Sequence, residues 1–175
     1  MNTPAQIQAA IREIPDFPKP GILFRDITPV LADPAIFRAA IGEFAGICRR
    51  AKAEKIAGID ARGFLFGATV AYELGLGFVP VRKKGKLPFH TITQSYDLEY
   101  GSSEVEIHTD AFAKGERVAL IDDLLATGGT AGAAIKLIRQ SGAHVVAAAF
   151  LIELAGLGGR EVLGDVEVTS IVSYT

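Results

Sequence analysis

From residue 55 onward, short apolar runs alternate with longer segments whose apolar residues recur at helical spacing. The apolar runs predict strands at residues 55–60, 77–83, 118–122 and 144–154, and an apolar segment at 166–174 closes the chain. The helical spacing predicts helices at residues 64–74 and 130–143. Because strands that alternate with helices are joined by right-handed crossovers, this order predicts an α/β fold with a mostly parallel sheet covered on both faces.

The N-terminal third follows a different pattern. Thr3 and Pro4 are typical of a helix start, and Ile7, Ile11 and Ile14 recur on one helical face, which predicts a short amphipathic helix.

The next segment, residues 15–31, contains prolines and a glycine that exclude a regular helix, so an irregular segment is expected there. Asp33 and Pro34 then predict the start of a second helix that runs to about Lys52. Its buried face is predicted to contain Ile36, Phe37, Ile41, Phe44 and Ile47.

Residues 95–110 break the alternation of strands and helices. Val105 and Ile107 lie between polar neighbours, and Gly101 and Ser102 supply a turn. This pattern is typical of a two-stranded antiparallel ribbon, which we expect to project from the sheet as a mobile flap.

Composition narrows the class of protein. The chain has 175 residues, of which 49% are hydrophobic, as expected for one compact domain. A formal net charge of −2 gives no general attraction to nucleic acid or to an acidic membrane. The single cysteine, Cys48, excludes an internal disulfide and is expected to be a buried, unreactive thiol. With no leader or membrane span apparent, a cytoplasmic protein is expected.

The stretch VALIDDLLATGGT contains the most specific chemistry. Asp122 and Asp123 end an apolar strand, and residues 127–130, Thr-Gly-Gly-Thr, lie between that strand and a helix. Glycines and free helix amides form a phosphate cradle, and carboxylates accept hydrogen bonds from vicinal hydroxyls, so a sugar phosphate fits both. The stretch lacks the Lys of a P-loop, and its acids precede the glycines, unlike in a dinucleotide motif.

Two basic segments also follow predicted strands, and ligands bind at the carboxyl ends of parallel strands. Taken alone, Arg62 is most simply a surface ion-pair partner, and the run RKKGK is most simply a solvated turn. Their position after strands favours side chains that face a cleft and neutralise an anion.

VALIDDLLATGGT resembles the phosphoribosyl-pyrophosphate signature of type I phosphoribosyltransferases. Together with GILFRDITPVL, GIDARGFLFG, RKKGKLP and SYDLEYG, it makes the chain similar to the adenine phosphoribosyltransferase family from end to end. The resemblance implies the fold of that family, a parallel sheet flanked by helices, with a small N-terminal hood and a flexible β-ribbon flap. It implies a single domain over residues 1–175, with helix and hood at 1–33, the α/β core at 34–175 and the flap at about 88–110.

The resemblance also implies site roles. The ribose hydroxyls are assigned to Asp122 and Asp123, and the 5-phosphate to Ala126, Thr127, Gly128, Gly129 and Thr130. Pyrophosphate is assigned to Ala61, Arg62, Arg82, Lys83 and Lys86. Adenine is assigned to the ring of Phe24 and the backbones of Leu23 and Arg25, whose side chain is expected in a structural ion pair.

The implied reaction is displacement of pyrophosphate from 5-phosphoribosyl 1-pyrophosphate by N9 of adenine, giving AMP. Arg62 is expected to act at the leaving group, Glu99 to transfer a proton at the purine, and Tyr100 to help close the flap. Mg²⁺ is expected to arrive on the substrate's pyrophosphate and on water, with no direct protein ligand, and a homodimer is expected.

Two alternatives remain at this point. One is a phosphoribosyltransferase for another purine, such as a 6-oxopurine, although a hood-like segment at the N-terminus favours adenine. The other is a non-catalytic regulator that senses phosphoribosyl pyrophosphate, although the N-terminal helix is too short for a helix-turn-helix and lacks a basic face.

Overall fold

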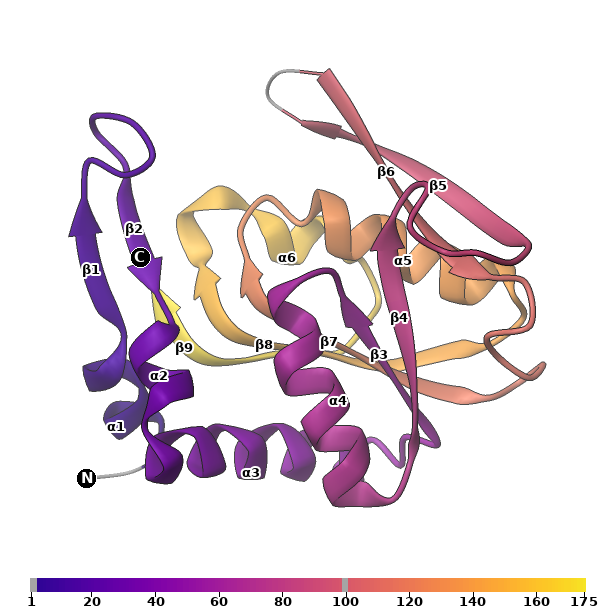
Figure 1. Cartoon of the computed structure of the whole chain (residues 1–175), viewed down its shortest axis with the longest axis horizontal. Helices are drawn as coiled ribbons and strands as arrows, with labels where there is room; N and C mark the ends of the chain where they lie inside the picture. The colour runs from indigo at the N-terminus through magenta and orange to yellow at the C-terminus, as the bar shows by residue number, and fades with distance from the viewer. Residues whose placement is uncertain (1–2, 99–100) are drawn as a thin grey trace.

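The computed structural model describes residues 3–98 and 101–175, and in this part of the chain a seven-stranded sheet has helices on both faces (Figure 1). The sheet order is β5-β6-β4-β3-β7-β8-β9, and β5 (Thr91–Leu98) and β6 (Gly101–His108) form a ribbon at one edge. The other five strands are β3 (Lys55–Ile59), β4 (Gly77–Lys83), β7 (Arg117–Leu125), β8 (His144–Leu154) and β9 (Val168–Tyr174). These five strands pair in parallel, so the predicted α/β class and mostly parallel sheet are confirmed.

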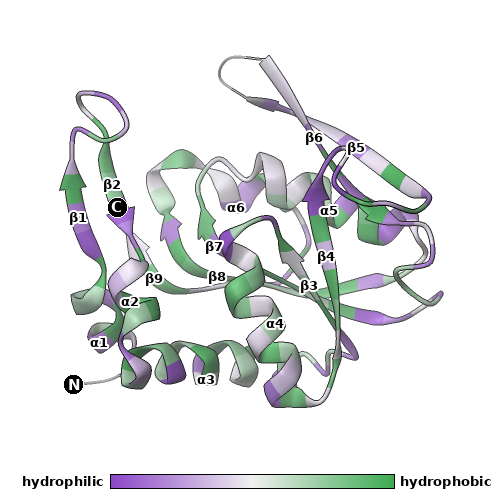
Figure 2. Ribbon diagram, in the orientation of Figure 1, coloured by the Kyte–Doolittle hydropathy of each residue, from purple (hydrophilic) through white to green (hydrophobic). Residues whose placement is uncertain are grey.

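Helices cover the two faces of the sheet unequally. One face packs against α1 (Thr3–Ala10), α3 (Pro34–Arg50) and α4 (Arg62–Leu74), and the other packs against α5 (Gly129–Gln140). The hydropathy colouring shows apolar residues concentrated where these helices meet the central strands, whereas the ribbon β5–β6 is mostly neutral or polar (Figure 2). Burial of this apolar area provides the main favourable term in folding.

Helix α3 begins where the sequence predicts. The Asp33 side chain accepts hydrogen bonds from the amides of Ala35 at 2.8 Å and Ile36 at 3.1 Å, and Pro34 occupies the first helical position. Cys48 on this helix is buried, and burial raises the pKa of its thiol to about 11. The thiol is therefore protonated at neutral pH and unreactive, as expected.

The N-terminal prediction is wrong in two respects. Helix α1 ends at Ala10, and Ile14 instead belongs to a strand, β1 (Arg12–Pro15), which pairs with β2 (Leu23–Asp26). The segment predicted to be irregular therefore contains a strand and also a short helix, α2 (Thr28–Ala32). The helical spacing of Ile14 is coincidental, because its partner is Phe24 across the hairpin. The hairpin and α2 form the hood.

The ribbon is confirmed as an antiparallel pair, β5 (Thr91–Leu98) and β6 (Gly101–His108). Its base belongs to the main sheet, because Arg82 and Lys83 of β4 pair with Glu106 and Val105 of β6. The ribbon therefore extends the sheet edge and rises above the carboxyl ends of the parallel strands (Figure 1). No helix within residues 3–98 and 101–175 is long and apolar enough to cross a membrane.

Candidate active site

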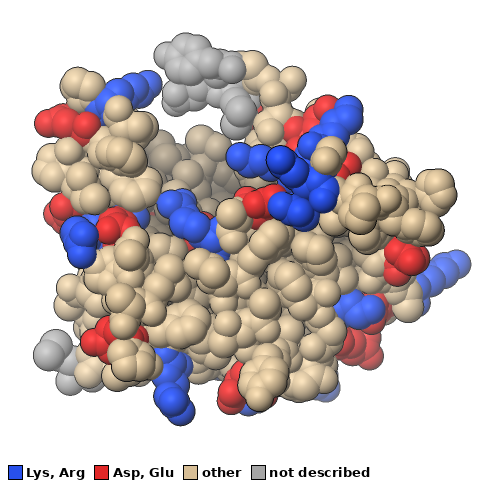
Figure 3. Space-filling view, viewed as in Figure 1, with Lys and Arg blue, Asp and Glu red and all other residues tan. Residues whose placement is uncertain are grey.

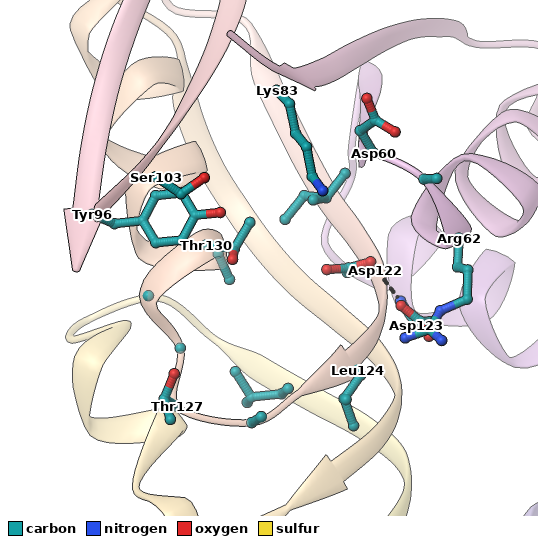
Figure 4. Close-up of a pocket in the computed structure, with 17 residues that line it drawn as sticks. Asp60, Arg62, Lys83, Tyr96, Ser103, Asp122, Asp123, Leu124, Thr127 and Thr130 are labelled. Atoms are coloured by element: carbon teal, nitrogen blue, oxygen red, sulfur yellow. Dashed lines mark hydrogen bonds and ion pairs between the residues drawn. The ribbon is translucent and has the colours of Figure 1, made fainter. Parts of the chain in front are cut away.

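A cavity of about 610 Å³ opens at the carboxyl ends of β3, β4 and β7, below the ribbon (Figure 4). The predicted site residues that line it are Ala61, Arg62, Lys83, Asp122, Asp123, Ala126, Thr127, Gly128, Gly129 and Thr130. Basic side chains gather beside a hollow in the surface near the end of β4 (Figure 3). Predicted residues from three separated segments of the chain thus meet in one place.

The acidic pair lies inside β7, where the sequence placed the strand end at Asp122. Pairing with β8 continues past the acids, with Asp122 opposite Phe150 and Leu125 opposite Glu153. Adjacent strand residues point to opposite sides, so the two carboxylates diverge. Asp122 faces the cavity between β7 and the ribbon, whereas Asp123 faces Arg62 (Figure 4).

Other groups of the chain partly balance the negative charge of the two carboxylates. The Asp123 Oδ2 atom lies 2.6 Å from Arg62 Nε, and the Asp122 Oδ1 atom accepts a hydrogen bond from the Asp123 amide at 2.8 Å. Asp122 is half-buried, with protein around its carboxylate on the sides that do not face the cavity. This burial and the charge of Asp123 raise the pKa of Asp122 well above its ordinary value.

The two carboxyl groups suit a sugar diol. Carboxylate oxygens accept hydrogen bonds from vicinal hydroxyls, and a cation beside Asp122 would lower the pKa of this residue again.

Helix α4 begins against this pair without any intervening side chain. A Cβ atom added to Gly63 would lie 2.7 Å from Asp122 Oδ1 and 3.0 Å from the Ile121 carbonyl oxygen. The peptide bond between Asp60 and Ala61, just before the helix, is cis. Gly63 thus allows the segment from Asp60 to Arg62 to lie directly beside the acids.

The loop after β7, which the sequence predicts to be a phosphate cradle, leads into α5. Gly128 has φ +81° and caps the N-terminus of α5, which begins at Gly129. A non-glycine residue would be strained at this φ. The first amides of α5 have no partners within the helix and are available to an anion.

A second, smaller cavity of about 150 Å³ adjoins the first below the hood. Its walls are Ile22, Leu23, Phe24, Arg25, Arg62, Asp123, Leu124, Ile152 and Leu154. All three residues predicted to contact adenine are present. Arg62, Asp123 and Leu124 line both cavities, so ligands in the two cavities would be neighbours.

The Arg25 side chain is engaged elsewhere, as expected. It forms an ion pair with Glu13, and its guanidinium carbon lies 3.8 Å from the centre of the Tyr174 ring. Arg62 approaches Phe24 of the hood, with its guanidinium carbon 5.8 Å from the centre of the Phe24 ring. The hood is thereby joined to the C-terminal strand and to the candidate site.

The basic turn is only partly in the cavity. Lys83 lines it, but Arg82 pairs with Asp60 at 3.2 Å and donates to the Lys86 carbonyl oxygen at 3.2 Å. Lys86 itself is exposed and does not line the cavity. The predicted catalytic residue Glu99 and the predicted flap residue Tyr100 lie outside the described residues.

Three polar lining residues were missed by the sequence reasoning: Asp60, Tyr96 and Ser103. Tyr96 and Ser103 are directly opposite each other in the ribbon and lie beside Thr130 (Figure 4). The alternation of residues along β6 could have identified Ser103, because Ser103 lies on the same face of the strand as the buried Val105. Asp60 ends the same apolar run that introduces Arg62.

Glu106 holds the basic turn in place from the ribbon. It is only 4% exposed, and its Oε1 atom accepts hydrogen bonds from the amides of Lys86 and Leu87, both at 3.0 Å. Burial alone raises the pKa of Glu106, but hydrogen bonds from these amides outweigh it and lower the pKa.

Glu106→Gln is expected to lower the free energy of unfolding by about 1–3 kcal/mol at pH 7, the value of hydrogen bonds to a charged group. Because the folded pKa lies below the ordinary one, this stabilisation is present above about pH 4.3 and is lost as the pH falls through the folded pKa. Urea unfolding over a pH series should show the gap between variant and wild type closing in acid. Glu104→Gln is the matched control, because Glu104 forms an exposed pair with Lys84. A gap independent of pH would contradict this role.

Comparisons with known proteins agree with the geometry. The phosphoribosyl transferase domain family matches residues 27–174. The adenine phosphoribosyltransferase of Parvibaculum lavamentivorans is 60% identical over 166 residues, which span 94% of this chain and 95% of that protein.

Solved structures show the same likeness. The adenine phosphoribosyltransferase of Thermoanaerobacter pseudethanolicus matches with a TM-score of 0.94 at 50% identity, covering 98% of this chain and 99% of that one. The Saccharomyces cerevisiae enzyme, complexed with adenine and D-2,5-dideoxy-2,5-imino-altritol 1,6-bisphosphate, matches with a TM-score of 0.93 at 40% identity, covering 97% and 98%. The end-to-end likeness and the two adjoining cavities together show that this chain belongs to the adenine phosphoribosyltransferase family.

Proposed function

We propose that the larger cavity binds 5-phosphoribosyl 1-pyrophosphate, that the smaller one binds adenine, and that the enzyme joins them to give AMP and pyrophosphate. The observation that supports this most strongly is the shared wall of the two cavities, formed by Arg62, Asp123 and Leu124. A polar cavity with a phosphate cradle lies directly against a cavity with mainly apolar walls. The complex of the Saccharomyces cerevisiae relative with adenine and a bisphosphate supports the same pair of ligands.

The reaction follows from where charge develops. The bond from C1 of the ribose to the pyrophosphate oxygen breaks, its electron pair leaves with pyrophosphate, and N9 of adenine forms the new bond. The ring proton that adenine loses passes to a base, the role that the sequence predicts for Glu99. Positive charge builds on the sugar and negative charge on the leaving oxygen. Arg62 and Lys83 are placed to stabilise the leaving group, while Asp122 and Asp123 hold the ribose.

Arg62 has to change partners for this role. Its pair with Asp123 at 2.6 Å occupies the guanidinium, whose side chain is 44% exposed and therefore free to rotate toward an incoming anion. A pyrophosphate offers a more concentrated negative charge than one carboxylate. The proposed exchange moves Arg62 to the leaving group and frees Asp123 for the ribose hydroxyls.

We propose Mg²⁺ as the metal that accompanies the substrate. Oxygen ligands suit this ion, and Asp122, which faces the cavity, could hold it through water. Among the described residues no three His, Cys, Asp or Glu side chains gather to hold a metal, so its main ligands are taken to be pyrophosphate oxygens and water. When bound, the ion neutralises negative charge on the leaving group.

The cytoplasmic location remains a prediction from the sequence.

A homodimer is proposed as the working form. An apolar groove of about 350 Å³ lies between α3 and α4, with Phe37, Ile41 and Tyr72 in its wall, and Tyr72 is 88% exposed. Exposed apolar patches of this kind mark interaction surfaces. A second copy is proposed to cover this groove.

Incubation of the protein with phosphoribosyl pyrophosphate, Mg²⁺ and each nucleobase in turn is expected to yield AMP from adenine alone. Discrimination follows from donor and acceptor placement, because an unpaired polar group at the purine edge costs more than a lost contact. Chromatographic identification of the nucleotide checks this. Formation of IMP or GMP in place of AMP would reassign the base, and binding of phosphoribosyl pyrophosphate without any nucleotide formed would favour the regulator.

A further inference from the structure

The phosphate loop, residues 126–130, rests on a segment to which the sequence analysis assigns no role. This segment is residues 158–162, the turn and short helix α6 (Gly159–Val162) that follow the 3₁₀ turn η1 (Ala155–Leu157). We propose that residues 158–162 act as a buttress that fixes the shape of the phosphate loop, and that Arg160 is the positioning residue that holds the buttress in place. The inference rests on the proposed function, because it concerns the 5-phosphate subsite.

The contact between loop and buttress is backbone against backbone. A Cβ atom added to Gly159 would lie 2.2 Å from the Ala126 carbonyl oxygen, and one added to Gly128 would lie 2.5 Å from the Gly159 carbonyl oxygen. Neither distance is possible for a real side chain. Both positions therefore require glycine, because the backbone of the opposite segment occupies the space of a side chain. The loop cannot move closer to the buttress.

The same surface continues along helix α5. A Cβ atom added to Gly132 would lie 3.3 Å from Val162 Cγ1. The buttress thus touches the loop at Ala126 and Gly128 and the following helix one turn later. Both the loop and the helix amides that form the cradle share one support.

Arg160 ties this support to the sheet. Its Nε and Nη2 atoms lie 3.0 Å and 2.5 Å from the two carboxylate oxygens of Glu153 at the end of β8, and Nη1 donates to the Val168 carbonyl oxygen at 2.7 Å. Glu153 is only 7% exposed. Hydrogen bonds from Arg160 lower the pKa of Glu153, so the pair stays ionised at neutral pH. Arg160 thereby fastens the buttress to β8 and β9 at once.

A fixed loop matters because phosphate recognition depends on converging amides. Displacement of binding groups by about 1 Å can cost about 100-fold in rate. The buttress touches no part of the smaller cavity. Loss of the buttress should therefore weaken binding of the sugar phosphate and leave adenine binding unchanged.

Gly159→Ala tests the contact itself. Gly159 does not have positive φ, so the backbone tolerates alanine, and the methyl group is opposed by the Ala126 carbonyl at 2.2 Å and by Leu125 Cδ1 at 3.0 Å. The KM for phosphoribosyl pyrophosphate is expected to rise about 10-fold to 100-fold with the KM for adenine unchanged. Gly156→Ala is the matched control, because an added Cβ there meets nothing within 4 Å. Equal KM values for the two variants would overturn the proposal.

Arg160→Met tests the attachment of the buttress to β8 and β9, with Arg139→Met as the control. Arg139 pairs with Asp165 at 2.8 Å in the same region, but at an exposed position. Arg160→Met should reproduce the selective rise in KM, Arg160→Lys should restore part of it, and Arg139→Met should not change it. A rise in both KM values in proportion to lost stability would indicate a merely structural role and overturn the proposal.

Calorimetric binding of ribose 5-phosphate separates this inference from the proposed function. If the wild type makes no AMP, the proposed function fails, yet the affinities of Gly159→Ala and Gly156→Ala for ribose 5-phosphate still test the buttress. Weaker binding by Gly159→Ala alone supports it, and equal binding refutes it.

Discussion

Asp123→Asn is expected to raise the KM for phosphoribosyl pyrophosphate by about 10-fold to 100-fold, which corresponds to about 1.5–3 kcal/mol for hydrogen bonds to a charged group. Asp123 is only 6% exposed and borders both cavities, so the loss is felt where the ribose is held. Stability should fall much less, because the partner Arg62 is half-exposed and can be solvated. Steady-state kinetics and urea unfolding measure the two effects.

The same substitution should change the titration of Asp122. Removal of the neighbouring charge lowers the pKa of Asp122, which nevertheless stays above its ordinary value because burial is the larger cause. Asp165→Asn serves as the control, since its carboxylate is 81% exposed and far from the cavity lining. An unchanged affinity of Asp123→Asn for ribose 5-phosphate would reject the ribose role.

Gly63→Ala is expected to reduce kcat/KM by about 100-fold or more. The new methyl group would lie 2.7 Å from Asp122 Oδ1, so helix α4 must move away from β7 and carry Arg62 with it. Displacement on this scale disrupts positioning of the leaving group. Overpacking should also lower the free energy of unfolding by about 1–3 kcal/mol. Kinetics and urea unfolding again supply both measurements.

Gly42→Ala is the matched control for this experiment. Gly42 lies within α3, and an added Cβ there meets nothing within 4 Å. Alanine should stabilise that helix by about 0.5–1 kcal/mol and leave turnover unchanged. If Gly63→Ala had the same kcat/KM as Gly42→Ala, the direct contact between α4 and the acidic pair would not be needed for activity.

The parts of the fold that sequence reasoning predicted are those set by local pattern. Apolar runs located β3, β4, β7 and β8, and Asp33 marked the start of α3 through a cap that involves only its nearest neighbours. The acidic pair and the glycines after it also lie within one short stretch. Their meeting in one cavity follows from the rule that parallel strands present their carboxyl ends at the same edge.

The missed parts depend on contacts between distant residues. Ile14 lies in a strand because Phe24 pairs with it, and the spacing of Ile14 from Ile11 cannot reveal that partner. Arg82 looks equivalent to Lys83 in the sequence, yet it pairs with Asp60 and does not line the cavity, whereas Lys83 does. The Gly159 contact with Ala126 joins segments more than thirty residues apart, and no local pattern announces it.

One guanidinium, that of Arg62, borders both cavities and pairs with the carboxylate that also borders both. Whatever draws Arg62 toward one chamber alters the wall of the other. Thermodynamic linkage then requires the effect to be reciprocal, so that each substrate changes the affinity of its companion by the same factor. We therefore expect the two substrates proposed for this enzyme to be energetically coupled before any bond between them forms.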